Sequence, residues 1–155
     1  MERTLNTCNR IRSLPMYKKI LVGYDGSDGS KQALIQAIQL AKAIGAELHA
    51  LWSRSSLPHY PETVDEVDEE REAASAFLQK LTKEIVEYSR QYAFEIHADS
   101  KSGHAAKTIV DYAKQGNFDL IVVGHKGHSG LWGNLLGHTP DKVSENAHCS
   151  VLIVR

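Results

Sequence analysis

Residues 118–139 read FDLIVVGHKGHSGLWGNLLGHT, and this stretch limits which folds the chain can adopt. It opens with the clearest buried strand of the sequence, residues 119–123, because a short unbroken apolar run beside turn residues is typical of a strand covered on both faces. Five of the eleven glycines of the chain then fall between Gly124 and Gly137. Glycine lets a backbone approach a ligand closely, and successive N–H groups in such a loop converge on an anion. A phosphate-binding loop at the carboxyl end of a parallel strand is therefore predicted.

Outside this stretch, apolar runs and segments with helical spacing alternate along the chain. Ser27 is expected to cap the first helix at its N-terminus and Gly45 to end it. Strands are expected at residues 19–24, 47–52, 94–98, 119–123 and 150–154, and helices at residues 28–44, 65–92, 105–115 and 141–147. This alternation indicates an α/β protein with a parallel sheet, helices on both faces and right-handed crossovers.

The composition is that of a single packed domain. With 155 residues, of which 42% are hydrophobic and 24% charged, the chain has the usual size and make-up of one globular unit. We expect residues 1–16 to form a disordered N-terminal extension and residues 17–155 to form the domain. The net charge of -1 argues against binding to nucleic acid or to an anionic membrane. Two distant cysteines, no apolar run of about 18 residues and no signal-peptide pattern are typical of a cytoplasmic protein.

The motifs disfavour several other ligand and reaction classes. The G-x-x-x-x-G-K-[ST] motif of P-loop proteins is absent, and no G-x-G-x-x-G follows the first strand. Residues 125–128 match the H-x-G-H motif of nucleotidyl transferases, but that motif belongs after the first strand and here it follows the fourth. A metal site at the loop histidines is disfavoured, because they lack the helical H-x3-H spacing that preorganises one. No nucleophile–base pair is evident, so no enzymatic activity is expected beyond slow ATP hydrolysis.

Four features together resemble the universal stress protein family over Tyr17 to Arg155. They are YKKILVGYDGS from residue 17, FDLIVVG from residue 118, the G-x2-G-x9-G spacing from Gly124 to Gly137, and CSVLIVR from residue 149. The resemblance implies a Rossmann-like, adenine nucleotide alpha hydrolase-like sheet of five parallel strands in the order 3-2-1-4-5. It also implies ATP binding by members with the glycine loop, and dimers through the last strand, Ser150 to Val154. An apolar last strand left as an open edge favours a homodimer on physical grounds as well.

The resemblance also implies a nucleotide site at named positions. The nucleoside would lie against Asp25, the adenine beside the backbone around Ser53, and the ribose beside residues 123–124. The end of the glycine loop would surround the phosphates. The full predicted set is Gly23, Asp25, Ser53, Val123, Gly124, Lys126, Gly127, Gly137, His138 and Thr139. The chemistry agrees, since a carboxylate accepts hydrogen bonds from hydroxyl or amino groups and glycine amides donate to phosphate oxygens.

Two residues at the end of the loop depart from the family pattern. His138 stands where the family usually has Ser or Thr, and Pro140 stands where it often has a hydroxyl residue and supplies no N–H. ATP is the first expected ligand, with ADP or AMP as alternatives and Mg²⁺ carried by the phosphates. The expected function is a stress-response or signalling module that binds an adenine nucleotide. The alternative is a dimeric interaction protein whose degenerate loop binds none.

Overall fold

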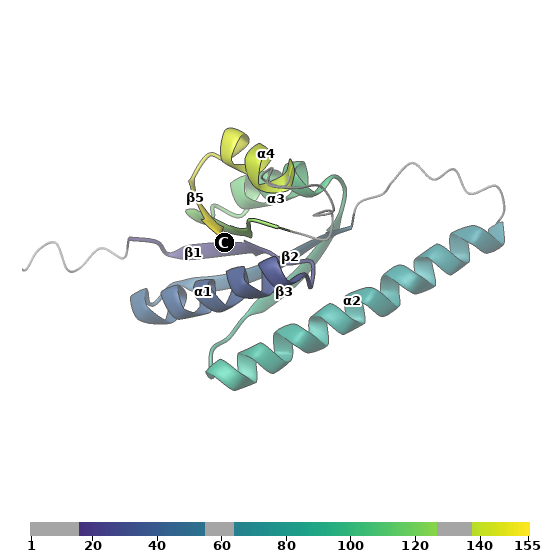
Figure 1. The fold of residues 1–155 in the computed structure, drawn as a ribbon, viewed down its shortest axis with the longest axis horizontal. Helices are drawn as coiled ribbons and strands as arrows, with labels where there is room; N and C mark the ends of the chain where they lie inside the picture. The colour runs from purple at the N-terminus through teal and green to yellow at the C-terminus, as the bar shows by residue number, and fades with distance from the viewer. Residues whose placement is uncertain (1–15, 55–63, 127–137) are drawn as a thin grey trace, which may run out of the picture.

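The computed structural model describes residues 16–54, 64–126 and 138–155 (Figure 1). Strands and helices alternate through this part of the chain, as the sequence pattern predicts. The strands are β1 (Lys19–Gly23), β2 (Glu47–Arg54), β3 (His97–Ser102), β4 (Leu120–Gly124) and β5 (Ser150–Val154). The helices are α1 (Asp28–Ile44), α2 (Val64–Tyr92), α3 (Ala105–Gln115) and α4 (His138–Asn146).

The five strands form one parallel sheet in the order β3-β2-β1-β4-β5, which confirms the predicted fold class and strand order. β1 lies in the centre, where Leu21 pairs with His49 of β2 on one side and with Ile121 of β4 on the other. The chain builds outward from β1 to β3 and then returns to add β4 and β5 on the opposite side. The strand order therefore reverses beside β1, where open α/β sheets bind their ligands.

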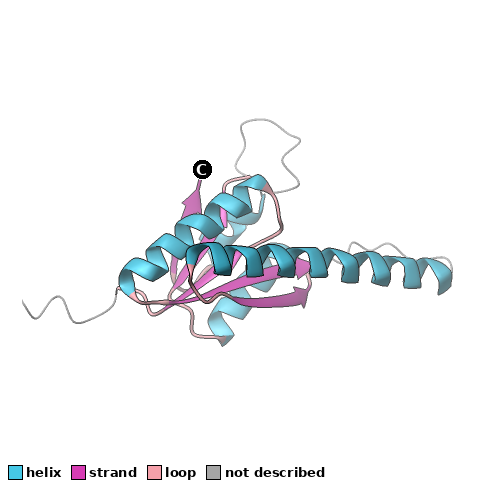
Figure 2. Cartoon of the chain, turned by 90° about the horizontal axis from the view of Figure 1, so that it is seen from below, coloured by secondary structure: helices cyan, strands magenta, loops and turns pink. Residues whose placement is uncertain are grey.

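Helices cover both faces of the sheet, with α1 and α2 on one face and α3 and α4 on the other (Figures 1 and 2). The side chains of β1 alternate between these layers. Ile20 and Val22 pack in the cluster that contains α1 and α2, whereas Leu21 packs in the cluster that contains α3. All three are fully buried, which explains the unbroken apolar run in the sequence.

The ends of α1 are the ones predicted from its capping residues. Ser27 is the N-cap, and its hydroxyl accepts a hydrogen bond from the N–H of Ser30 at 3.3 Å. Gly45 ends the helix with a φ of 73°, and its N–H donates to the carbonyl oxygen of Ala41. Glycine occupies this left-handed conformation without the steric penalty that a side chain would add.

The described side chains of the long helix α2 that pack against the core begin at Phe77 and continue toward its C-terminal end. The helix has 29 residues, and the end toward Val64 extends past the sheet in both views (Figures 1 and 2). Leu81 and Ile85 are buried against the sheet, and the Tyr24 hydroxyl donates to Glu84 Oε2 at 2.7 Å. Burial, and then this acceptor, raise the pKa of Tyr24, so the phenol stays protonated. Within the described ranges, no helix is both long enough and apolar enough to cross a membrane.

The third strand does not lie where the sequence pattern predicts it. β3 runs from His97 to Ser102 rather than over residues 94–98. All of its side chains are exposed, so no apolar alternation marks it in the sequence. Phe94 and Ile96, which suggested the earlier boundary, instead pack against the core before the strand begins.

The N-terminus of α1 lies directly against the end of β4. A Cβ atom on Gly124 would stand 2.5 Å from both the carbonyl carbon and the carbonyl oxygen of Gly29. A Cβ atom on Gly29 would in turn overlap the carbonyl oxygen of Lys126. These neighbours are backbone atoms, which cannot rotate away as a flexible side chain would. Glycine at both positions is therefore required for the helix and the strand to meet.

We expect Gly29→Ala to destabilise the protein by about 3 kcal/mol, because the added methyl group must push α1 away from β4. A loss of stability would reveal the close contact, because alanine otherwise stabilises a helix by about 1 kcal/mol relative to glycine. Gly45→Ala is the control: nothing lies within 4 Å of its Cβ position, and its cost is limited to about 1 kcal/mol for the positive φ. Urea unfolding followed by circular dichroism measures both, and a stabilising Gly29→Ala would contradict the close approach.

Candidate functional site

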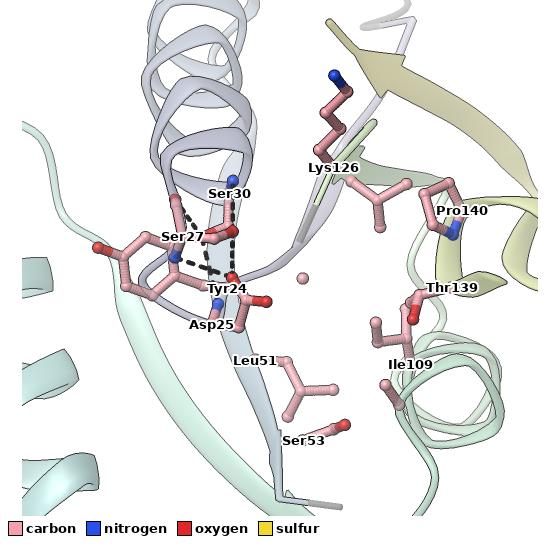
Figure 3. A pocket seen from close by; sticks show the side chains of 14 residues that line it. Tyr24, Asp25, Ser27, Ser30, Leu51, Ser53, Ile109, Lys126, Thr139 and Pro140 are labelled. Atoms are coloured by element: carbon pink, nitrogen blue, oxygen red, sulfur yellow. Dashed lines mark hydrogen bonds between the residues drawn. The ribbon is translucent and has the colours of Figure 1, made fainter. Parts of the chain in front are cut away.

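A cavity of about 240 Å³ opens at the carboxyl ends of β1, β2 and β4 (Figure 3). Its walls come from the turn after β1, the end of β2, one side of α3, the end of β4 and the first turn of α4. The lining residues are Gly23, Tyr24, Asp25, Ser27, Ser30, Leu51, Ser53, Ala105, Ile109, Val123, Gly124, Lys126, Thr139 and Pro140. The cavity thus lies where the strand order reverses, which is the usual ligand position in this architecture.

The turn after β1 holds the Asp25 carboxylate at one side of the cavity. Asp25 Oδ1 accepts hydrogen bonds from the Ser27 N–H at 3.0 Å and from the Ser27 hydroxyl at 2.5 Å. The backbone N–H of Asp25 donates to the Ser30 hydroxyl at 3.3 Å. These bonds join the carboxylate to the N-terminus of α1, so its position is set before any ligand arrives (Figure 3).

Ser53 supplies a buried polar atom to the same cavity. It lies on β2, which continues past the predicted end at Trp52. Its Oγ atom is buried and has no hydrogen-bond partner among the described residues. A buried hydroxyl without a partner costs about 1–3 kcal/mol. The side chains of Leu51 and Ile109 line the adjoining wall (Figure 3). This end of the cavity is therefore an apolar surface with one hydroxyl group that can form a hydrogen bond to a ligand.

The opposite wall joins the end of β4 to the start of α4. Val123 and Gly124 line it from β4, and Thr139 and Pro140 line it from the first turn of α4. α4 begins three residues earlier than predicted, since a proline is tolerated in the first turn, where its missing N–H breaks no helical hydrogen bond. The N-terminus of a helix carries free N–H groups and partial positive charge, which favour an anion at this wall.

The structure brings most of the predicted site residues together. Those that line the cavity are Gly23, Asp25, Ser53, Val123, Gly124, Lys126 and Thr139. In Figure 3 the ammonium group of Lys126 points away from the other labelled side chains, so only its stem lines the wall. Gly127 and Gly137 lie outside the described residues. His138 begins α4, but its side chain also lies outside the described part of the structure.

Several lining residues were not anticipated from the sequence. They are Tyr24, Ser27, Ser30, Leu51, Ala105 and Ile109. Pro140, which the sequence marks as a departure from the family pattern, also lines the cavity. Ser27 and Ser30 had a signal, because Ser27 lies two residues after Asp25 in the turn and Ser30 lies in the first turn of the helix that follows. No feature of the sequence places Ala105 and Ile109 at the cavity, since helical spacing identifies the buried face of α3 but not the strand ends that it reaches.

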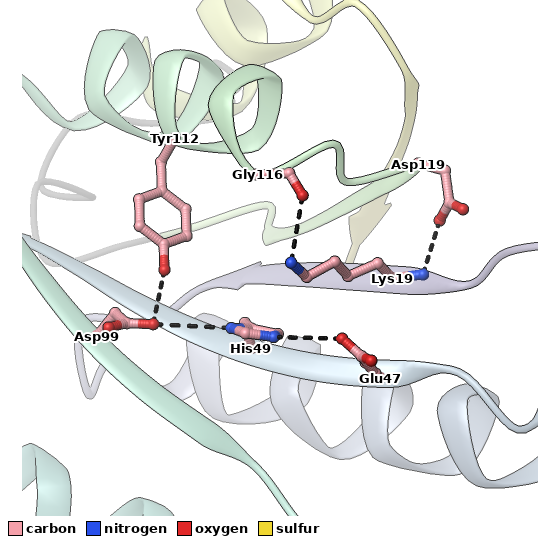
Figure 4. A network of polar contacts seen from close by, with 7 residues as sticks. All are labelled: Lys19, Glu47, His49, Asp99, Tyr112, Gly116 and Asp119. Atoms are coloured by element: carbon pink, nitrogen blue, oxygen red, sulfur yellow. Dashed lines mark hydrogen bonds and ion pairs between the residues drawn. The ribbon is translucent and has the colours of Figure 1, made fainter.

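A second group of polar side chains lies away from the cavity (Figure 4). The Tyr112 hydroxyl of α3 donates to Asp99 Oδ2 of β3 at 2.6 Å, and this oxygen lies 3.7 Å from His49 Nδ1 of β2. Burial, and then the nearby His97 and Lys19, lower the pKa of His49 from its usual 6.5. The fold therefore favours neutral imidazole, and this contribution to stability falls as the pH drops below 6.5. The Tyr112–Asp99 hydrogen bond joins the exposed strand β3 to α3.

Protein side chains that could ligate a metal do not converge in the described ranges. No group of three or more His, Cys, Asp or Glu side chains there has a suitable arrangement. Cys149 packs beside the cluster under α3, and burial raises the pKa of its thiol, with Asp119 contributing less. The chemistry that the described cavity offers is thus hydrogen bonding, apolar contact and the electrostatics of a helix N-terminus.

Comparison with known proteins gives a consistent result. The sequence model of the universal stress protein family matches residues 16–155. The chain is 36% identical over 151 residues to universal stress protein YxiE of Bacillus subtilis, which covers 90% of this chain and 100% of that protein.

Two solved structures agree with the sequence comparison. Universal stress protein UspA from Lactobacillus plantarum superposes with a TM-score of 0.81 at 30% identity, covering 90% of this chain and 98% of that one. A universal stress protein crystallised in complex with cAMP superposes with a TM-score of 0.69 at 30% identity, covering 90% of this chain and 97% of that one. The matches extend over nearly the whole of each protein, and the chain therefore belongs to the universal stress protein family.

Proposed function

We propose that this protein binds an adenine nucleotide in the cavity between β1, β2 and β4 and acts as a stress-response module that is switched by nucleotide occupancy. The observation that carries the proposal is the meeting of Asp25, the unpartnered Ser53 hydroxyl and the bare backbone of Gly124 in one cavity. These groups suit the three parts of a nucleotide: ribose hydroxyls, a planar base with polar edges, and phosphate. The related protein whose structure contains cAMP supports the same ligand class.

The nucleoside end of the proposed site is the better defined. The adenine would lie against Leu51 and Ile109, with one of its nitrogens bonded to Ser53 Oγ. Satisfying that buried hydroxyl removes a cost that the protein alone carries. The ribose would lie beside Val123 and donate a hydroxyl to Asp25. The carboxylate is already oriented by Ser27, so little ordering is required on binding.

The phosphate end would use backbone donors. The start of α4 at Thr139 and the close-packed backbone at Gly124 face this side, and the predicted contacts of Gly127, Gly137 and His138 complete it. Pro140 lines the wall without an N–H to donate, which reduces the number of donors available. ATP is the first proposed ligand, with ADP and AMP as alternatives. Mg²⁺ would be held by the phosphates, and hydrolysis, if present, would be slow.

The proposed assembly is a cytoplasmic homodimer joined through β5. Ser150 and Leu152 of this edge strand are exposed, and Leu152 retains 36% of its accessible surface. An exposed large apolar side chain on an open strand edge is a site for pairing with another chain. A second copy of β5 would cover it without adding a new element to the sheet.

We expect Asp25→Asn to weaken the binding of ATP, ADP and AMP by the same factor, about tenfold or more, because the lost charged hydrogen bond is to the nucleoside that all three share. The asparagine oxygen can still accept the hydrogen bonds from Ser27, so the turn is retained. Isothermal titration calorimetry measures the three affinities. The control is Asp111→Asn on the exposed side of α3, where the carboxylate pairs with Lys107. It causes the same change in charge and should leave the three nucleotide affinities unchanged.

Two outcomes would contradict this prediction. A loss confined to ATP would place Asp25 at the phosphates instead of the nucleoside. The absence of binding to all three nucleotides in the unmodified protein would reject the proposed function and favour the dimeric module without a nucleotide.

Leu152→Glu is expected to convert the dimer to monomers, because the new carboxylates would face each other across the paired strands. Val86→Glu is the matched control, since Val86 on α2 is also exposed, at 44%, and is not on the β5 edge. Sedimentation equilibrium should give half the mass for the first variant and the dimer mass for the second. An unmodified protein that is monomeric at all concentrations would contradict the proposed interface.

A further inference from the structure

A second cavity, of about 270 Å³, lies between α2 and the ends of β2 and β3. The residues that line it are Trp52, Arg54, Arg71, Ala74, Ser75, Leu78, Ser100, Lys101 and Ser102. None of them lines the cavity assigned to the nucleotide.

The strand register explains why these side chains share one face. Trp52 pairs with Ser100, and Arg54 pairs with Ser102, so the four side chains lie on the same side of the two parallel strands. The Trp52 ring lies 5.3 Å from the ring of Phe77, which identifies this side as the one covered by α2. By the same alternation, the side chain of Lys101 begins on the opposite face of the sheet.

Two guanidinium groups at this cavity form few ion pairs with the described carboxylates. Arg54 Nη2 donates to the Ser102 hydroxyl at 3.0 Å, and no carboxylate of the described chain pairs with it. Arg71 lies 3.9 Å from Asp68, but their side chains are 74% and 64% exposed. Such an exposed pair contributes at most about 1 kcal/mol, so it leaves Arg71 able to exchange Asp68 for a stronger anion.

The polar lining matches one chemical group in particular. Two arginines offer planar sets of N–H donors, and Ser75, Ser100 and Ser102 add hydroxyl donors around them. A phosphate monoester carries a charge of about -1.5 to -2 at pH 7 and three acceptor oxygens, which suits two cations and several donors. The apolar remainder of the wall, Trp52 with Ala74 and Leu78, can contact the organic part of an ester.

We propose that this cavity binds a phosphate group, either free or as the monoester of a small organic molecule, between Arg54 and Arg71. The phosphate displaces Asp68 from Arg71 and bridges β2 to α2. This inference goes beyond the proposed nucleotide site and does not depend on it, because the two cavities have no described residue in common.

The test uses Trp52 as the reporter. The chain has two tryptophans, so Trp132→Phe leaves Trp52 as the only one. Phenyl phosphate, inorganic phosphate and phenol are titrated into this protein at low ionic strength, and Trp52 fluorescence is recorded. We expect both phosphates to bind and phenol not to bind. Tighter binding of phenyl phosphate would identify the ligand as an ester, and equal binding would identify it as free phosphate.

Variants distinguish this cavity from any other phosphate site. Arg54→Gln and Arg71→Gln should each weaken phosphate binding by about tenfold, equal to about 1.4 kcal/mol. Asp68→Asn should strengthen it by at least about twofold, because it removes the competing carboxylate. Lys107→Gln, which removes one positive charge from the far side of α3, should leave the affinity unchanged. Unchanged affinity in both arginine variants, or no binding at concentrations up to about 10 mM, would overturn the proposal.

Discussion

Backbone meets backbone where the first turn of α1 crosses the end of β4, because Gly29 and Gly124 place no side chain between them. This contact sets how near the turn of Asp25 and Ser27 lies to the end of β4. The cavity opens beside this contact, at the carboxyl ends of β1, β2 and β4 and between α3 and the start of α4. A side chain at either glycine would move one wall of the cavity relative to the other. The shape of the cavity therefore depends on a packing contact between the backbones of α1 and β4.

Much of the fold could be predicted from local patterns. The apolar runs at residues 20–22 and 120–123 are buried on both faces, and Ser27 and Gly45 cap α1 as predicted. Local patterns do not predict the strand order, which came from the family resemblance and not from any single segment. β3 was misplaced because an exposed edge strand has no apolar period, whereas Phe94 and Ile96 beside it do pack against the core.

The candidate site was partly predictable for the same reasons. Residues in or just after the last part of a buried strand, such as Val123 and Asp25, can be placed at its carboxyl end from the sequence alone. Ile109 could not, because its place in the cavity depends on how α3 lies across the sheet. The role of Gly29 was also hidden: a second glycine in Asp-Gly-Ser-Asp-Gly-Ser is ordinary for a turn, and only the position of β4 shows why a side chain is excluded.

The end of β2 supplies opposite faces to two different cavities, with Ser53 on one and Trp52 and Arg54 on the other. The central claim concerns the first of these. A crystal structure of the protein grown with saturating ATP tests it most directly. We expect adenine against Leu51 with a hydrogen bond to Ser53 Oγ, and ribose bonded to Asp25. An empty cavity at saturating ATP, or a nucleotide bound elsewhere on the protein, would contradict the claim.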